Sequence, residues 1–203
     1  MKNKKLAVLA VVSACLLALS GCSPSDSGGS SGGTALTGPI ADLQGTWITG
    51  CYAINSEYAK ETFTLSGTTV SSKADYYSDA SCTTLDNRFS GTYTNVVIGD
   101  NVTFTDGTSG RKMSYDVQAN EYTIFSATTA SLINSASYCG LTNWTTNTAI
   151  DIIDKFCLGV VRDVKNTTKY NLYNLMRNNL YLGTSKTDVY PTTVNTNVMY
   201  VKQ

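Results

Sequence analysis

Carboxylates are the side chains best able to do acid–base chemistry in this chain, because the sequence contains no histidine. Without histidine, Ser-His-Asp and Cys-His catalytic arrangements are excluded. Three pairs of carboxylates lie within four residues of each other: Asp75 and Asp79, Asp151 and Asp154, Glu57 and Glu61. Charged side chains with no further motif around them are usually solvated surface groups. We therefore predict that the protein is not an enzyme.

The sequence lacks the patterns that are typical of metal-binding and phosphate-binding sites. The run Gly107 to Lys112 is glycine-rich and ends in two basic residues, but it lacks the G-x-x-x-x-G-K-[ST] pattern of a phosphate loop and is predicted to be a hairpin turn. The carboxylates do not form an Asp-x-Asp-x-Asp-Gly calcium loop. The cysteines include no close pair such as C-x-x-C. We expect neither a metal nor another cofactor.

Cys22 has a chemistry of its own. It closes the run Leu19-Ser20-Gly21-Cys22, which ends an apolar stretch starting at Leu6, after a basic start with three lysines. This pattern indicates a bacterial lipoprotein signal, in which residues 1–21 are removed and the Cys22 thiol takes a diacylglyceryl group. The apolar stretch is about 14 residues, shorter than the roughly 20 that cross a bilayer. A plain secretory signal cleaved elsewhere is the alternative.

A lipid on Cys22 predicts that the protein is located at the cell envelope, with the membrane as a partner. If the bacterium has two membranes, Ser23 in place of Asp after the lipidated cysteine implies the outer membrane, facing the periplasm or the cell surface. Residues 22–38 are rich in Ser and Gly, which predicts a flexible tether reaching roughly 20 to 25 Å. Residues 39–203 are long enough for one domain with a sizeable core.

Four cysteines remain after Cys15 leaves with the signal and Cys22 is lipidated: Cys51, Cys82, Cys139 and Cys157. An even set in an exported domain predicts two disulfides, and four cysteines allow three connectivities. We favour Cys51–Cys82 and Cys139–Cys157, because each pair encloses a loop with no other cysteine.

The charge of the chain argues against nucleic acid as a partner. Three of the fifteen Lys and Arg lie in the signal, which leaves twelve against fifteen Asp and Glu. No basic stripe is present, and a nucleic-acid-binding surface requires one.

Alternation with a period of two dominates from Gly45 onward and predicts strands with one buried face. The alternating segments are Thr62–Leu65, Val102–Thr105, Met113–Val117, Tyr170–Leu172 and Leu180–Leu182. Turn signals fall at Ser66-Gly67, Gly99–Asn101, Asp106-Gly107, Ala119-Asn120 and Arg177–Asn179. Short strands between tight turns indicate an antiparallel meander, either a barrel or a sandwich.

One insertion, near residues 129–157, interrupts this rhythm. Ile150, Ile153 and Cys157 have helical spacing, which predicts a short helix starting near Thr146 or Thr148. We expect the insertion to be a loop that covers one end of the barrel, with a moving lid as the alternative.

Several short motifs resemble those of lipocalin-like domains. They are the G-x-W of Gly45-Thr46-Trp47, the run to Cys51 followed by Tyr77–Cys82, and the tail segments Lys169–Leu172, Leu180–Gly183, Tyr190–Thr192 and Tyr200-Val201. The resemblance implies an all-β fold, an antiparallel meander closed into a lipocalin-like barrel. In that family the barrel has eight strands and the Trp plugs its closed end, whereas the number of strands in this chain is left open. In lipocalins an Arg packs over this Trp, and here Lys202 is the one basic residue near the C-terminus.

The resemblance and the composition together favour a binding function. Thirteen tyrosines could line a barrel interior that holds a small amphipathic or lipidic ligand, or could equally be divided between core and surface. Which residues would bind a ligand is not indicated. The alternative is an interaction, assembly or adhesion lipoprotein that binds an envelope protein through the outside of the barrel.

Overall fold

The computed structural model describes residues 38–105, 107–157, 160–161 and 163–203. The predicted signal peptide, the Cys22 lipidation site and the tether up to residue 37 lie outside the described residues and stay predictions. No helix in the described ranges is long and apolar enough to cross a membrane.

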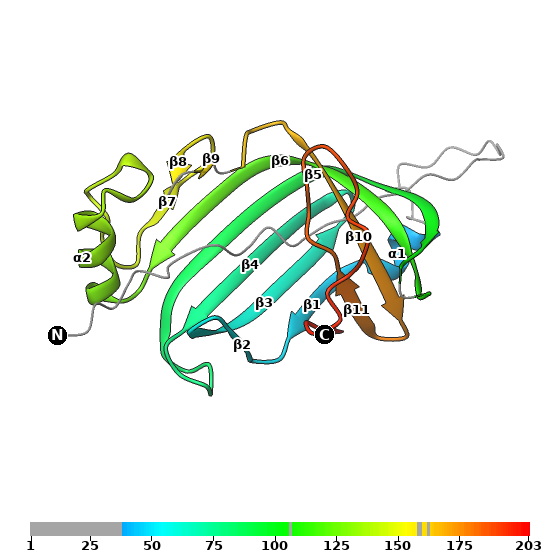
Figure 1. Cartoon of the computed structure of the whole chain (residues 1–203), viewed down its shortest axis with the longest axis horizontal. Coiled ribbons are helices and arrows are strands. Elements are labelled where there is room, and N and C mark those ends of the chain that lie inside the picture. Colours follow the sequence, from blue (N-terminus) through cyan, green and yellow to red (C-terminus); the bar gives the residue numbers. More distant parts are fainter. Residues whose placement is uncertain (1–37, 106, 158–159, 162) are drawn as a thin grey trace, which may run out of the picture.

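Eight antiparallel strands form a closed barrel (Figure 1). They are β1 (Gly45–Thr49), β3 (Glu57–Ser66), β4 (Thr69–Tyr77), β5 (Leu85–Thr103), β6 (Ser109–Ile124), β10 (Thr168–Met176), β11 (Asn179–Leu182) and β12 (Tyr200–Lys202). The short strand β1 closes the barrel, because it pairs with β3 on one side and with β12 on the other. The predicted all-β antiparallel barrel is confirmed.

The remaining elements extend or cover the barrel. Strand β2 (Tyr52–Ile54) pairs with β3, and β7 (Ala149–Asp151) pairs with β6. Strands β8 (Phe156–Cys157) and β9 (Val160–Val161) form a separate two-stranded sheet. The helices are α1 (Pro39–Leu43), α2 (Ala127–Ser135) and the 3-10 turn η1 (Tyr138–Gly140).

Turn residues in the sequence mark both hairpins and bulges. The predicted turn at Gly67 joins β3 to β4, and its positive φ of 61° suits glycine. The turns predicted at Gly99–Asn101 and Ala119-Asn120 are wrong, because both segments lie inside long strands. The register of β5 and β6 shifts close to both places, so there the breaker residues accompany bulges rather than ends of strands.

Trp47 and α1 close one end of the barrel. The Trp47 side chain is fully buried, and its Nε1 donates a hydrogen bond of 2.9 Å to the carbonyl oxygen of Leu43 in α1. The Lys202 Nζ lies 5.1 Å from the centre of the Trp47 ring and donates to the carbonyl oxygen of Asp42 at 3.1 Å. Lys202 therefore packs over Trp47 as a cation–π partner, in the position that the resemblance gives to an arginine.

The insertion contains a helix, but not where the sequence predicts it. Helix α2 begins after Ser126, whose Oγ accepts a hydrogen bond from the Thr129 N–H at 3.3 Å. The predicted helix over 148–157 is wrong: Ile150 lies in β7 opposite Tyr122, and Asp154 has a left-handed backbone with φ 59°. The β-branched isoleucines fit a strand better than a helix, so spacing alone was misleading.

The insertion has its own hydrophobic core on the inner face at the end of β6. Ala130 and Ile133 of α2 and Trp144 pack with Tyr122 and Ile124 of β6. In Figure 1 the insertion lies at the end of the barrel opposite α1.

Both predicted disulfides are confirmed. Cys51–Cys82 joins the segment before β2 to the turn between β4 and β5, and Cys139–Cys157 joins η1 to β8 within the insertion.

Candidate functional site

The inner wall of the barrel changes character along its length. Near α1 the inward side chains of Trp47, Phe63 and Met113 are fully buried. Further along, two neighbouring rows of inward-facing residues cross β3 to β6 in register: Phe63, Ser72, Gly91 and Asn120 in one, and Glu61, Ala74, Phe89 and Tyr122 in the other.

Three of these inward residues, Ser72, Phe89 and Asn120, are partly exposed. They share a face with the buried Phe63 and Glu61, so their exposure means that solvent reaches the inside of the barrel at this level. We call the inner wall around Ser72, Phe89 and Asn120 the mouth. Small side chains, Ser72, Ala74 and Gly91, make up much of it.

A buried carboxyl group lies beside the mouth. Glu61 on β3 is 7% exposed and accepts hydrogen bonds from the hydroxyl groups of Tyr52 on β2 and Tyr200 on β12. Its backbone N–H donates to Thr49 Oγ1 at 2.8 Å, which ties β3 to β1 at the seam that closes the barrel. Burial raises the pKa of the Glu61 carboxyl, and the two tyrosine hydrogen bonds offset only part of this rise.

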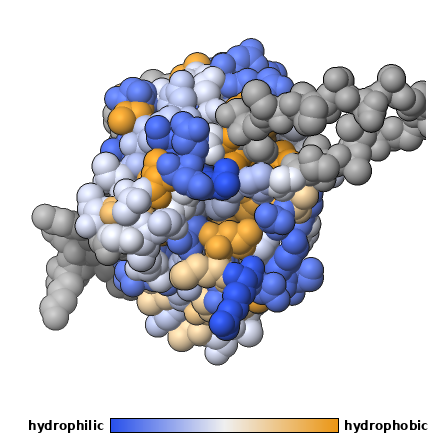
Figure 2. Space-filling view, turned by 90° about the vertical axis from the view of Figure 1, so that its right-hand side faces the viewer, coloured by the Kyte–Doolittle hydropathy of each residue, from blue (hydrophilic) through white to orange (hydrophobic). Residues whose placement is uncertain are grey.

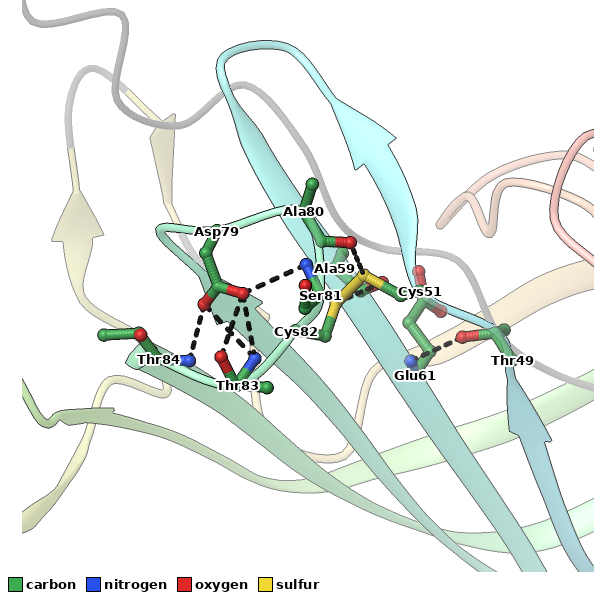
Figure 3. Close-up of a disulfide and its surroundings, with 10 residues drawn as sticks. All are labelled: Thr49, Cys51, Ala59, Glu61, Asp79, Ala80, Ser81, Cys82, Thr83 and Thr84. Carbon is green, nitrogen blue, oxygen red and sulfur yellow. Dashed lines mark hydrogen bonds between the residues drawn. A yellow bond between two sulfur atoms is a disulfide. The ribbon is translucent and has the colours of Figure 1, made fainter.

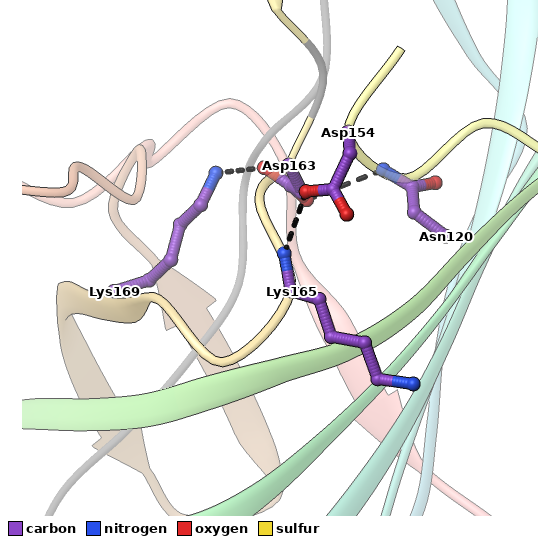
Figure 4. Close-up of polar contacts among 5 residues, drawn as sticks. All are labelled: Asn120, Asp154, Asp163, Lys165 and Lys169. Carbon is purple, nitrogen blue, oxygen red and sulfur yellow. Dashed lines mark hydrogen bonds and ion pairs between the residues drawn. The ribbon is translucent and has the colours of Figure 1, made fainter.

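An ion pair is buried on the opposite side of the mouth (Figure 4). Lys169, on β10 opposite Tyr115, pairs through its Nζ with Oδ1 of Asp163. The Asn120 Nδ2 donates to the other oxygen, Oδ2, at 3.2 Å. Donors from β6 and β10 thus hold both oxygens of one carboxylate. Asp163 and Lys169 are buried, and Asn120 is partly exposed.

The main chain around Asp163 is also fixed. The Asp154 N–H donates to the Asp163 carbonyl oxygen at 3.0 Å, and the Asp154 carboxylate accepts from the Lys165 N–H at 3.0 Å. Asn166 donates to the carbonyl oxygen of Val117 on β6 at 2.8 Å. The segment therefore places the Asp163 carboxylate over the mouth.

Two buried polar atoms in this part of the barrel have no hydrogen-bond partner among the described residues: the Tyr122 hydroxyl and the Asn171 Nδ2. Tyr122 stacks on Phe89 with ring centres 4.4 Å apart, and burial raises the pKa of its hydroxyl. Asn171 lies on β10 opposite Met113, one inward position beyond Lys169. Such atoms are uncommon in packed interiors, because each costs about 1 to 3 kcal/mol.

The structure does not bring the candidate carboxylates together as pairs. Asp75 instead binds Arg88, with Oδ2 3.0 Å from Nη2, and Asp151 accepts from the Ile153 N–H. Glu57 and Glu61 share a face of β3, but four residues of strand separate them by about 13 Å. Burial and the nearby charge of Asp86 raise the pKa of Glu57.

Asp79 has a structural role in the turn between β4 and β5 (Figure 3). Its carboxylate accepts hydrogen bonds from the backbone N–H groups of Ser81, Thr83 and Thr84. These bonds lower its pKa to about 2, the strongest being that from Thr84. The same turn carries Cys82, so Asp79 and the Cys51–Cys82 disulfide together fix the rim of the barrel.

The tyrosines are divided between buried and partly exposed positions. Seven are buried: Tyr76, Tyr93, Tyr115, Tyr122, Tyr138, Tyr173 and Tyr200. Of these, Tyr76 contributes to the aromatic wall of the mouth, with its ring centre 6.1 Å from that of Phe89. The others pack in the barrel core or under the insertion.

Sequence reasoning missed Lys169, Asp163 and Asn120. The alternation of Tyr170 and Leu172 predicted a buried face, yet the inward face of β10 carries Lys169, Asn171 and Tyr173. Leu172 and Tyr170 face outward, where Tyr190 packs against Tyr170 with ring centres 5.0 Å apart. Since both faces of β10 are covered, period two alone could not identify the inner one.

In the part of the chain that the structure describes, no three His, Cys, Asp or Glu side chains are grouped as metal ligands would be. Comparisons with protein-family models and with curated proteins find no match to this chain.

Proposed function

We propose that this protein binds a small amphipathic or lipidic molecule in the mouth of its barrel, anchored to a membrane of the cell envelope by lipid on Cys22. The observation that supports this most is the exposure of the inward-facing Ser72, Phe89 and Asn120 in an otherwise packed barrel. An aromatic wall with a few buried polar groups suits a ligand with an apolar body and one polar end.

A binding role without catalysis fits the same residues. The carboxylates that could have worked in pairs are engaged with Arg88 or with backbone N–H groups, or lie far apart. The polar groups at the mouth are tied to each other in a fixed arrangement, which favours recognition of a ligand.

Filling the mouth tests the proposal. Ser72→Trp puts a large ring on the inner wall, while Ser71→Trp, one residue earlier on the same strand, puts it on the exposed outer face. The full chain in lipid nanodiscs is titrated with a short-chain fluorescent fatty acid, with empty nanodiscs as the blank. Wild type and Ser71→Trp should bind with roughly micromolar Kd, and Ser72→Trp at least about tenfold more weakly. Equal binding by all three, or none by wild type, would refute the proposal.

A second candidate function, protein interaction through the outside of the barrel, is favoured by one surface feature. Met176 and Val201 are 52% and 36% exposed, and register places Met176, Asn179, Val201 and Ile48 in one row across β10, β11, β12 and β1. Figure 2, which views the right-hand side of Figure 1, shows several patches of hydrophobic side chains among hydrophilic ones on that side of the molecule. Single exposed apolar residues are ordinary, but three apolar residues, Met176, Val201 and Ile48, in one row of four across neighbouring strands suit a partner surface.

Cross-linking in the native envelope distinguishes this second candidate. If the row binds an envelope protein, a double variant with Met176→Asp and Val201→Asp should lose a cross-linked product that Ser72→Trp retains. A product lost in neither variant would rule out this surface.

A further inference from the structure

We propose that the ligand carries a carboxylate, and that this carboxylate replaces the side chain of Asp163 between Lys169 and Asn120. The inference rests on the proposed binding function and specifies the chemistry of the ligand's polar end. In the structure, Asp163 fills the place that the ligand's head group takes when it binds.

The geometry of the Asp163 site is that of a carboxylate slot. Lys169 from β10 holds one oxygen and Asn120 from β6 holds the other at 3.2 Å, so a planar anion with two oxygens satisfies both donors. The two donors come from neighbouring strands of the rigid barrel. Asp163 comes from the segment that follows β9, outside the barrel wall. The two donors of the slot therefore lie on barrel strands, whereas Asp163, which now accepts their hydrogen bonds, does not.

Burial of Lys169 makes the exchange selective. An ammonium group that is buried needs an anion beside it, because an unpaired buried charge is strongly destabilising. Lys169 and Asp163 side chains are 9% and 7% exposed, respectively. A ligand that displaces Asp163 therefore restores an ion pair with Lys169 only if it carries a negative charge, which an uncharged alcohol of the same length does not.

The apolar part of such a ligand has a surface to lie on. Asn120 is in register with Gly91, and the next inward row carries Phe89 stacked on Tyr122. An alkyl chain whose carboxylate sits between Lys169 and Asn120 can follow this row along the partly exposed side chain of Phe89. Glu61 on the far side is buried and accepts hydrogen bonds from two tyrosine hydroxyl groups, and burial raises the pKa of its carboxyl.

Octanoate and 1-octanol, two water-soluble probes of equal chain length, test the inference. Their binding to the full chain in nanodiscs is measured by calorimetry for wild type, Asp163→Asn and Lys169→Met. Asp75→Asn is the matched control, because it removes the carboxylate of an ion pair with Arg88 on the outer wall. A further variant combines Asp163→Asn with Lys169→Met and removes the buried pair without leaving a lone charge.

Removing the internal competitor should tighten octanoate binding. Asp163→Asn should lower the octanoate Kd by about tenfold or more, and Lys169→Met should raise it by a similar factor, as expected for a hydrogen bond to a charged group. Octanol affinity should stay within about twofold throughout, and Asp75→Asn should behave as wild type. Octanoate should also raise the melting temperature of Asp163→Asn more than that of wild type, because it restores an anion beside Lys169.

The outcomes separate the two proposals. If neither probe binds any variant, the proposed function fails. If both probes bind, but octanoate is no more sensitive than octanol to Asp163→Asn and Lys169→Met, the mouth binds ligands and the carboxylate slot is wrong. If the single variants fail to fold, the variant with both Asp163→Asn and Lys169→Met tests the carboxylate slot instead. It should bind octanol as wild type does and show no preference for octanoate over octanol. A preference for octanoate that persists in this variant would overturn the inference.

Discussion

The carboxyl group of Glu61 and the hydroxyl group of Tyr200 are hydrogen-bonded inside the barrel, although 139 residues separate them in the chain. Glu61 lies on β3 and Tyr200 on β12, and both strands pair with β1. The contact therefore joins the two ends of the meander at the point where the barrel closes.

Tyr200→Phe should destabilise this seam without changing the fold. The variant leaves one oxygen of a buried carboxyl group without its donor, which should lower the free energy of unfolding by about 1 to 3 kcal/mol. Urea unfolding followed by circular dichroism measures the change. Tyr181→Phe, on a half-exposed residue of β11, should shift it by no more than about 0.5 kcal/mol. Equal effects would show that the Glu61 contact contributes nothing.

The raised pKa of Glu61 predicts stability that falls as pH rises. The folded state holds the Glu61 proton more tightly than the unfolded state, whose carboxyl has its ordinary pKa of 4.5. The stabilisation is complete below about pH 4.5 and is lost as pH rises through the folded pKa. Glu61→Gln should reduce this slope, and Glu57, whose pKa is also raised, accounts for part of what remains.

Unfolding free energies measured between pH 4 and pH 8 check whether stability falls as pH rises. Glu121→Gln, an exposed residue on β6, is the control and should leave the slope of the wild type unchanged. A slope that Glu61→Gln does not alter would mean that Glu61 titrates alike in both states.

Asp79 predicts the opposite dependence of stability on pH, in a lower pH range, so that stability falls as pH falls. Its pKa falls from 3.8 to about 2 because backbone N–H groups of the turn bind the carboxylate. The stability it contributes is present above pH 3.8 and is lost as pH falls through 2. Melting temperatures between pH 2 and pH 5 should fall less steeply in Asp79→Asn than in wild type. Asp188→Asn, on an exposed loop, should follow wild type.

The disulfide Cys139–Cys157 should stabilise the insertion separately from the barrel. Replacing both cysteines by alanine removes a bridge between residues 18 apart, worth about 3 kcal/mol in the chain-entropy model. The two tryptophans report on the two regions, since Trp144 packs in the insertion and Trp47 in the closed end. In a Trp47→Phe background, Trp144 fluorescence should shift to the red, while the strand signal in circular dichroism stays. If the red shift of Trp144 fluorescence came with a loss of the strand signal, the insertion and the barrel would unfold as one cooperative unit.

The alternation of apolar and polar residues correctly predicted several of the strands, because strand formation depends on neighbouring residues in the sequence. The alternation around Phe63 and Met113 placed strands correctly, because one face of each is buried against a single core. The predicted export signal and the spacing of the cysteines together predicted both disulfides. The closure of the barrel rests on pairings of β1 that join distant segments. The G-x-W resemblance implied a closed barrel, which periodicity alone could not distinguish from a sandwich, but the number of strands was not predicted.

The candidate site could not be predicted in the same way. Ile150 and Ile153 have the spacing of a helix, yet pairing with β6 and the backbone at Asp154 make the segment extended. Nothing in the sequence marks Lys169 as a buried charge, and only the register of β10 against β6 turns it inward toward Asn120 and Asp163. Such contacts depend on which strands become neighbours, and the sequence of one strand does not contain that information.

Native mass spectrometry of the full chain released from its own envelope tests the central claim most directly. Wild type and Ser71→Trp should each carry one additional small molecule besides the lipid that we propose on Cys22, and Ser72→Trp should lack it. The additional mass retained in Ser72→Trp, or absent from wild type even after the octanoate titration, would contradict ligand binding inside the barrel.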